Sequence, residues 1–417
     1  MSIGLAEEAP VFDLQLTAEI KKALTSKYGD PIPDYLHQII SGELAYIKQT
    51  EASIEFLTIA DIVKTVDTLG YPHRVRGALP SVFAGYLLGI SETNPLPAHY
   101  YCPNCKHIEF TGEECSGYDL NARHGARKCP LCGTEMQGDG QQLYPEMFFG
   151  LEGEKGLSFE LDLPKEALPA AINRLYELFD GNVLKGEREN HYYYPSTGEG
   201  KAFIAEAKGK NPAYVLAPDV CDHRAHRLRE IILTENRMLT VLKDMMDRTG
   251  LPVGNIQLDK IDYKDLFDPA SFLEFDDSNS REMNIIRYIK PGSFSEYLSV
   301  QGLAHGTGVW DETASLPVET LKTGNTGHKL SVFREDIYEC LLSHGYEKKE
   351  AFRVADMIGR GRGNRLSAED ISFMRRKGLD DTYISFVKEI DYLFPRAHAA
   401  EYAIQMLRLV EYKKYYS

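Results

Sequence analysis

Apolar residues recur every three to four positions along much of this chain, which is the spacing of one face of an α-helix. Near the N-terminus this pattern predicts helices in TAEIKKALTSKYG, capped by Thr17, in PDYLHQIISGELAYIKQ and in IADIVKTVDTLG, with stops at Gly29 and Gly70. The apolar run FAGYLLGI fits a buried helix, although periodicity does not decide for so short a run. From about residue 271 onward, the pattern predicts an almost wholly helical chain.

The middle of the chain is more mixed. LSFELDL, at 157–163, alternates apolar and polar residues and predicts a strand, and LPAAINRLYELFDG predicts an amphipathic helix. Residues 185–212 are polar and glycine-rich, which indicates loops around a short helix. The segment HRLREIILTENRMLTVLKDMMDRTG, at 226–250, predicts one helix that ends at Gly250.

Length and composition narrow the class of protein. A chain of 417 residues with 43% hydrophobic residues is expected to form two or three domains with proper cores. The formal net charge of −15 argues against non-specific binding to DNA phosphate but leaves a local basic groove open. No apolar run of about 18 residues and no basic, apolar leader are present, so we expect a cytoplasmic protein without a membrane span.

Four of the seven cysteines form two Cys-x-x-Cys pairs, in HYYCPNCKH and RKCPLCGTE. The first pair is Cys102 and Cys105 and the second is Cys129 and Cys132, and the loop between them is long enough to bring the two turns together. Four thiolates fill the tetrahedral coordination of Zn²⁺ and leave no open position. The spacing therefore predicts a structural zinc site, because matched turns of this kind fit metal binding better than a redox pair.

The other cysteines and histidines near these turns are weaker candidates for metal ligands. Cys115 is interpreted as a spare thiol, and His99, His107 and His124 as ordinary loop residues. Cys221 and Cys340 are scattered, which does not indicate a disulfide framework.

Several long segments surround this zinc motif and resemble, in the same order, the catalytic core of bacterial PolC, a C-family DNA polymerase III alpha chain. They are GYLLGISETNPLPAHYYCPNCKHIEF, KCPLCGTEM, GQQLYPEMFFGLEGEKG, KPGSFSEYLSVQGLAHGTGVW, AFRVADMIGRGRG and FPRAHAAEYAIQMLRLVEYKK. The likeness reaches both ends of residues 43–417 and is weak between about 165 and 270. The exonuclease, PHP, OB and clamp-binding regions of PolC have no counterpart in this sequence.

The resemblance implies an α+β fold with a nucleotidyltransferase-like palm, a zinc-ribbon insert and a mostly helical, fingers-like C-terminal region. We expect four parts. They are a helical N-terminal segment with the start of the palm-like region at 1–98, the zinc-ribbon insert at 99–143, the palm-like region at 144–270, and the helical fingers-like domain at 271–417.

Polymerases of this family hold two Mg²⁺ ions with aspartates, and the resemblance places other residues at those positions. Aligning on Gly153-Glu154-Lys155 and on Glu166 places Ser158 and Glu160 at the first two aspartate positions. Aligning back from Thr249-Gly250 places Ile232 at the third. The resemblance therefore implies that the metal-holding aspartates are replaced.

Nearby carboxylates offer substitutes. Asp162 lies two residues beyond Glu160 on the same strand face, and a shift of two in the other alignment offers Glu230. Asp259, Asp262 and Asp265 form a further acidic cluster, which we interpret as a solvated loop rather than a relocated metal site.

The phosphate-binding turn of the family is also altered. The matching segment is RVRGALPS, in which Arg76 and Gly77 remain, Ala78 lacks a hydroxyl and Pro80 lacks an N–H donor. The basic positions of the fingers are better kept, and the resemblance assigns them to the incoming triphosphate or the template. They are His305, beside Gly306, and Arg360, Arg362, Arg396 and His398. The alternatives to ligand binding are structural. Arg360-Gly-Arg-Gly could be a solvated helix end, and Ala397, Ala399 and Ala400 could serve only close packing.

Other candidate sites are weaker. EFDDSNSRE, at 274–282, lacks the glycine and the spaced glutamate of a calcium loop. Asp222, His223 and His226 offer metal ligands on one predicted helix face, but a chance surface grouping is the preferred interpretation.

Three functional hypotheses remain open. The first is a non-catalytic PolC-like core that binds nucleic acid, a nucleotide, or a replisome or mobile-element protein, including as an inhibitor of replication. The second is a polymerase-type nucleotidyltransferase that uses Mg²⁺ through Glu160, Asp162 and either Glu230 or Asp259. The third is a structural protein or a decaying gene copy that keeps the fold but has no function. Because the fold-bearing positions match and the metal-holding ones do not, we favour the first.

Overall fold

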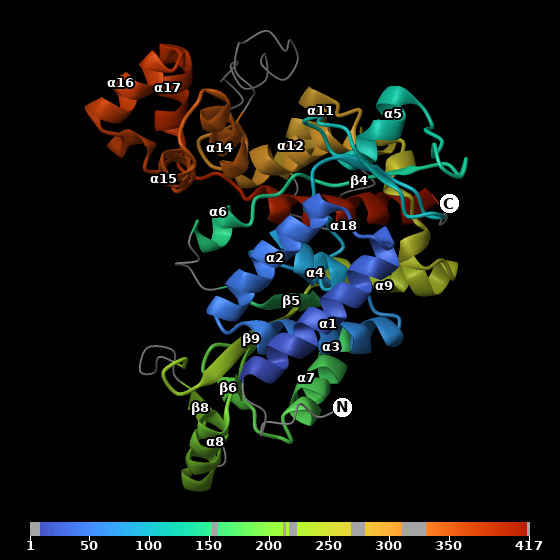
Figure 1. Ribbon diagram of the computed structural model, residues 1–417, viewed down its shortest axis with the longest axis vertical. Helices are drawn as coiled ribbons and strands as arrows, with labels where there is room; N and C mark the ends of the chain where they lie inside the picture. Colours follow the sequence, from blue (N-terminus) through green and yellow to red (C-terminus); the bar gives the residue numbers. More distant parts are fainter. Residues whose placement is uncertain are drawn as a thin grey trace.

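The computed structural model describes residues 9–151, 157–211, 214–216, 223–267, 280–310 and 331–414. Helices dominate, and two separate sheets lie among them (Figure 1). The α+β class predicted from the sequence is confirmed. Within the described residues, no helix is long and apolar enough to cross a membrane.

The larger sheet has six strands in the order β1-β5-β9-β7-β6-β8 and lies in the lower half of the molecule in Figure 1. In that order the strands are Arg74–Val75, Glu160–Leu163, Leu228–Glu235, His191–Pro195, Leu184–Gly186 and Val215–Leu216. The central pair, β5 and β9, is parallel, with Glu160 opposite Ile232 and Asp162 opposite Thr234. Strands β1 and β7 flank this pair in antiparallel fashion.

One face of this sheet is apolar and covered by helices. The buried residues Leu161, Leu163, Ile231 and Leu233 point to this face and share one core with α3 (Ser53–Thr68) and α7 (Leu168–Leu178). The alternate residues point to the other face and are mostly polar. The sheet is therefore packed on its apolar face and carries its polar side chains on the other.

Two predictions for this region are wrong. Residues 226–250 do not form one helix, because Leu228–Glu235 is a strand and helix α9 (Arg237–Thr249) begins only after Asn236. The Asn236 side chain accepts a hydrogen bond from the Leu239 N–H and caps the helix, while burial upstream of it alternates with a period of two. Likewise, 185–212 holds β6, β7 and the long helix α8 (Gly198–Lys210) instead of loops around a short helix.

The N-terminal helices partly follow the prediction. Helix α1 (Ala9–Tyr28) begins well before Thr17, whose hydroxyl donates to the Asp13 carbonyl 2.6 Å away inside the helix. It ends before Gly29, at a φ of +81°, as predicted. The remaining helices up to the palm strands are α2 (Asp34–Gln49), the short α4 (Phe83–Leu87), α6 (Glu146–Phe149) and a 3-10 turn, η1 (Leu79–Ser81).

The four cysteines lie in a small module with its own three-stranded antiparallel sheet. Its strands, in the order β3-β2-β4, are Ile108–Phe110, His99–Tyr101 and Gln137–Asp139. A short helical stretch, η2 and α5 (Gly117–His124), crosses this sheet and packs on it through Leu120. The module contacts the C-terminal half through Asp119, whose carboxylate accepts from the N–H groups of Phe294, at 2.7 Å, and Ser295, at 2.9 Å.

The C-terminal half is helical in its described residues, as predicted. Its helices are α11 (Ser280–Ile289), α12 (Phe294–His305), α14 (Arg334–Ser343), α15 (Lys348–Gly359), α16 (Ala368–Arg376), α17 (Asp381–Glu389) and α18 (Arg396–Lys414). The four domain ranges predicted from the sequence stay a prediction.

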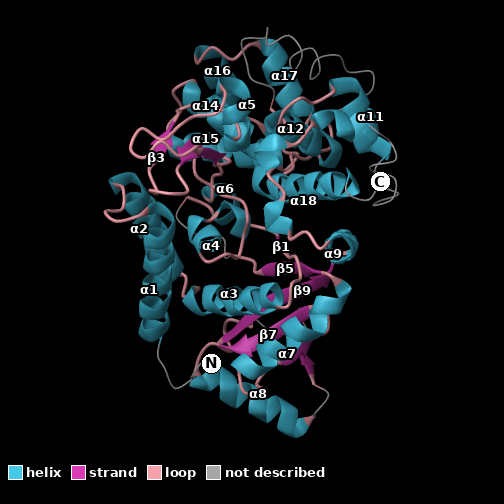
Figure 2. Ribbon diagram, turned by 90° about the vertical axis from the view of Figure 1, so that its right-hand side faces the viewer, coloured by secondary structure: helices cyan, strands magenta, loops and turns pink. Residues whose placement is uncertain are grey.

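Helix α18 runs between the two halves of the molecule, as Figures 1 and 2 show. It contacts α12 on one side and α9 and η1 on the other. Its residues Ala399 and Ala400 are fully buried, which agrees with the packing role considered for them. Its buried Glu401 accepts hydrogen bonds from Ser91, at 2.6 Å, and Thr93, at 2.9 Å.

Candidate functional site

The four cysteines of the two Cys-x-x-Cys pairs come together. All four sulfur atoms lie within 4.8 Å of one another, with 3.5 Å between Cys102 and Cys132 and 3.4 Å between Cys105 and Cys129. Sulfurs around a tetrahedral Zn²⁺ with Zn–S bonds of about 2.3 Å are separated by about 3.8 Å, so the spacing fits a metal and is too long for a disulfide. Backbone hydrogen bonds such as Cys102 N–H to His107 O, at 2.8 Å, hold each turn in place. The cluster therefore has the donors and geometry to hold a metal such as zinc.

The three positions matched to the aspartates of the family share the open face of the large sheet. Glu160 lies directly opposite Ile232 on the neighbouring strand, and Ser158 precedes Glu160 by two residues. The Ser158 hydroxyl donates to Glu160 Oε1 at 2.6 Å. At this place the face therefore holds one carboxylate, a hydroxyl and an aliphatic side chain.

Asp162 is the substitute carboxylate nearest to Glu160. It is fully buried, and two arginine side chains balance its charge. Arg74 Nη2 lies 2.5 Å from its Oδ2, and Arg76 Nη2 lies 2.6 Å from its Oδ1. Asn236 Nδ2 adds a hydrogen bond of 3.1 Å. The Arg74 guanidinium also lies 5.1 Å from the centre of the Tyr402 ring, which fixes it from the other side. This cluster, Arg74, Arg76, Asp162 and Asn236, is called the palm ion cluster below.

Glu230, the other substitute, is engaged by its strand neighbours. It accepts from Tyr193 OH at 2.6 Å and pairs with His191 Nδ1 at 2.7 Å. Burial alone would raise the pKa of Glu230, but these two partners outweigh burial and lower that pKa. The carboxylate is thus ionised and held by its own strands. Among the residues described, the only group of three or more potential metal-ligating His, Cys, Asp or Glu is the cysteine cluster.

The turn matched to the phosphate-binding loop is largely closed. Leu79 and Pro80 are buried, and the buried Ser81 hydroxyl donates back to the Ala78 carbonyl at 2.7 Å. The amides that follow, of Phe83 and Ala84, both donate to the Glu43 carboxylate at 2.8 Å. These N–H groups are therefore occupied by a side chain of the same chain.

Three of the predicted basic residues belong to the palm ion cluster or lie beside it. Besides Arg76, these are His398 and His305, both of which pack on Phe394, with ring-centre distances of 5.2 and 4.9 Å. Burial first, and then the positive charges of Arg74 and Arg76, lower the pKa of His398 to about 4. His398 is therefore a neutral imidazole at pH 7, a hydrogen-bonding group rather than a cation.

This state of His398 is open to a direct test. In an NMR titration of the ring nitrogens, His398 is expected to stay neutral down to about pH 5, with its resonance assigned by His398→Asn. Arg76→Gln removes one of the nearby cations and should raise the pKa of His398 toward the usual value of about 6.5. A pKa near 6.5 in the unchanged protein would contradict the burial and charge described here.

The other three predicted basic residues lie elsewhere. Arg396 is buried, and its guanidinium faces Asp336, at 2.5 Å, and Glu339, at 2.8 Å. Its charge is thus directed to carboxylates of α14, and a triphosphate cannot reach it in this arrangement. Arg360 is exposed and pairs with Asp356 at 3.0 Å, and Arg362 is exposed at the end of α15.

The remaining candidates do not gather into a site in the described part of the chain. Asp259 lies near Asn121 of the cysteine module, with Asn121 Nδ2 3.5 Å from its Oδ2. His226 stacks on Phe203 with a ring-centre distance of 4.3 Å, and His223 lies 5.4 Å from the ring of Tyr193. Asp222, Cys221, residues 153–155 and most of 274–282 lie outside the described residues, as does the side chain of Asp265.

Two residues of the palm ion cluster, Arg74 and Asn236, were not predicted from the sequence. The signal for Arg74 was available, because Arg74 and Arg76 alternate along an edge strand and so share a face. The signal for Asn236 was hidden by the interpretation of 226–250 as one helix.

Comparisons with known proteins agree with the resemblance. Residues 14–182 match the family model "Bacterial DNA polymerase III alpha NTPase domain". Over 464 aligned residues the chain is 29% identical to "DNA polymerase III PolC-type" of Streptococcus agalactiae, covering 93% of this chain and 31% of that protein. The protein of the same name from Caldanaerobacter subterraneus is 28% identical, with 99% of this chain and 33% of the relative covered.

The chain thus spans about a third of the length of the curated relatives it matches, and its similarity extends over nearly all of its own residues. The α+β fold with a cysteine module and a helical C-terminal half is consistent with a polymerase-like core. This chain is therefore a protein related to PolC, the bacterial DNA polymerase III alpha chain.

Proposed function

We propose that this chain is a non-catalytic PolC-like core that acts as a binding module for nucleic acid, a nucleotide or a replication protein in the cytoplasm. One observation carries this proposal. Where two metal ions would need converging carboxylates, the sheet offers Glu160 and a Glu230 already held by His191 and Tyr193, and the charge of the adjacent Asp162 is balanced by two guanidinium groups.

The charges on this sheet disfavour a pair of metal ions. Two Mg²⁺ ions a few ångströms apart are stable only where several negative oxygens offset their charge. In the palm ion cluster, Arg74 and Arg76 bring two positive charges to one carboxylate, which repels a further cation. Without the ions, the primer hydroxyl is not activated and the triphosphate is not neutralised, so the metal contribution to the rate is lost.

Binding of nucleic acid does not need these ions. Arg360, Arg362 and the neighbouring Arg365 are exposed at the end of α15 and in the turn that follows it, the region that resembles the fingers. A local basic surface of this kind can contact phosphate although the chain as a whole is acidic.

The test combines an activity assay with a binding assay. With primer–template DNA, nucleoside triphosphates and Mg²⁺ or Mn²⁺, the purified protein is expected to extend no primer. Fluorescence anisotropy at low salt is expected to show binding of the same DNA, weakened by Arg362→Ala and by added salt. Binding that is absent for every nucleic acid tested would direct the proposal to a protein partner, including inhibition of replication by protein contact.

The second candidate is a nucleotidyltransferase with rebuilt ligands, and Glu160 and Glu230 favour it because both lie on the open face of the sheet. That candidate predicts metal-dependent extension that is abolished by Glu160→Ala. Extension with this dependence would overturn the non-catalytic proposal.

A further inference from the structure

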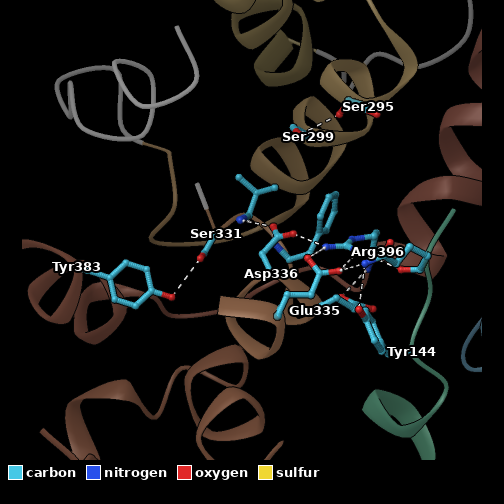
Figure 3. A network of polar contacts seen from close by, with 12 residues as sticks. Tyr144, Ser295, Ser299, Ser331, Glu335, Asp336, Tyr383 and Arg396 are labelled. Atoms are coloured by element: carbon cyan, nitrogen blue, oxygen red, sulfur yellow. Dashed lines mark hydrogen bonds and ion pairs between the residues drawn. The ribbon is translucent and has the colours of Figure 1, made fainter. Parts of the chain in front are cut away.

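A buried polar cluster lies where α18 begins, far from the palm ion cluster in sequence. The Arg396 guanidinium pairs with Asp336 and Glu339 of α14, and the Arg396 backbone N–H donates to Glu335 of the same helix at 3.1 Å. Figure 3 shows Glu335 and Asp336 beside Arg396. Glu335 and Asp336 are buried, and the Glu339 side chain is 11% exposed. Two carboxylates share one guanidinium, and a third acidic side chain lies next to them, so acceptor oxygens outnumber the positive charges here.

A small cavity of about 90 Å³ opens beside this cluster. It is lined by Asp336, Glu339 and Arg396, by Ser299 of α12, and by Gln141, which follows the cysteine module. Gln141 is 3% exposed, and neither its carboxamide oxygen nor its nitrogen has a hydrogen-bond partner among the described residues. A buried, unpaired amide costs about 1–3 kcal/mol per group, which indicates that the cavity is filled by something polar.

The dimensions and the lining restrict the occupant. A liquid water molecule takes about 30 Å³, so the cavity holds about three small species and is too small for a nucleotide. Carboxylate, hydroxyl and amide oxygens are the ligands of hard cations. Carboxylate oxygens do not converge within the described residues as a divalent cage requires, because the cysteine cluster is the only such group there.

We propose that this cavity binds a monovalent cation, potassium or sodium, together with one or two waters, between the Gln141 carboxamide oxygen and the carboxylates of Asp336 and Glu339. The cation offsets part of the excess negative charge, and the waters pair with the Gln141 nitrogen and with Ser299. The proposal does not depend on whether the core binds nucleic acid.

A cation in this cavity would stabilise the junction between the cysteine module and the C-terminal helices. The Gln142 carbonyl, next to Gln141, accepts from Arg396 Nη1 at 3.0 Å, so the segment leaving the cysteine module already contacts the start of α18. A cation here joins the cysteine module, α12, α14 and α18 at one point. Its removal is expected to loosen the contact between the module and the C-terminal helices.

The test compares thermal unfolding in potassium, sodium and choline chloride at equal ionic strength. The melting temperature is expected to be about 2–4 °C higher in potassium or sodium than in choline, and to rise with the cation concentration. Glu339→Gln and Gln141→Met should each abolish this difference, and the control Glu347→Gln, an exposed change immediately before α15, should keep it.

A second measurement locates the ion. Crystals grown with thallium(I) should show anomalous scattering next to Gln141. Equal melting temperatures in all three salts would overturn the proposal, as would a cation effect retained in both cavity variants or thallium bound only elsewhere.

Discussion

Purified protein is expected to contain one zinc ion per chain, and Cys129→Ser is expected to lose it together with the fold of the cysteine module. The core of this module consists of few residues, two of which are the metal-facing Cys102 and Cys129. A core this small does not hold two turns together unaided. Structural zinc contributes about 10–16 kcal/mol of apparent binding free energy in isolated finger peptides, which sets the upper limit of the loss.

The loss should spread beyond the module. Asp119 in the module caps the start of α12 with both carboxylate oxygens, so an unfolded module leaves the N–H groups of Phe294 and Ser295 unpaired. Zinc content by mass spectrometry, together with thermal unfolding, measures both effects. Cys115→Ser is the matched control, because Cys115 lies in the same small core but outside the four-sulfur group. Equal zinc content and stability in Cys129→Ser and Cys115→Ser would refute the assignment.

Replacing Asp162 should be far more costly than replacing Glu160, although the two residues share one strand face. Asp162→Ala leaves the buried Arg74 and the half-buried Arg76 without their counter-charge, and breaking a buried pair in this way costs about 3–5 kcal/mol. Glu160→Ala removes a partly exposed carboxylate whose described side-chain partner is Ser158, so we expect a change within about 1 kcal/mol.

Urea unfolding of the two variants separates two roles for Asp162. If Asp162 serves as a counter-ion, its loss destabilises the protein. A carboxylate kept for metal binding usually suffers repulsion from its neighbours, so its removal leaves stability unchanged or improves it. A stable Asp162→Ala protein would therefore contradict the palm ion cluster and revive a metal role for Asp162.

The sequence predicted the local elements best where one period governs a long segment. The helices of the C-terminal half were recognisable in this way, as was the strand predicted at 157–163, which the structure has at Glu160–Leu163. Residues 226–250 were misjudged because the apolar residues of LREIIL fit both periods, and only Asn236 marks the change from strand to helix. Helix α1 was predicted too short because Thr17 looks like a cap but hydrogen-bonds inside the helix.

The candidate site was predictable in its covalent motifs and less so in its long-range contacts. Cysteine spacing alone indicated the group that the structure brings together. By contrast, the partners of Arg396 lie about 60 positions away, and those of Asp162 more than 70, so neither pairing leaves a local trace. A basic residue that matches a family position can therefore serve as a core ion pair, and sequence does not separate the two roles.

Helix α18 has a mechanical consequence. Its Tyr402 ring faces Arg74 of the sheet, its Glu401 binds Ser91 and Thr93, and its first residue anchors α14. A rotation of the helical half against the sheet would have to break these desolvated contacts together, with no solvent to replace them. The two halves should thus behave as one stiff body. A partner then meets a preformed surface, and the chain loses little conformational entropy on binding.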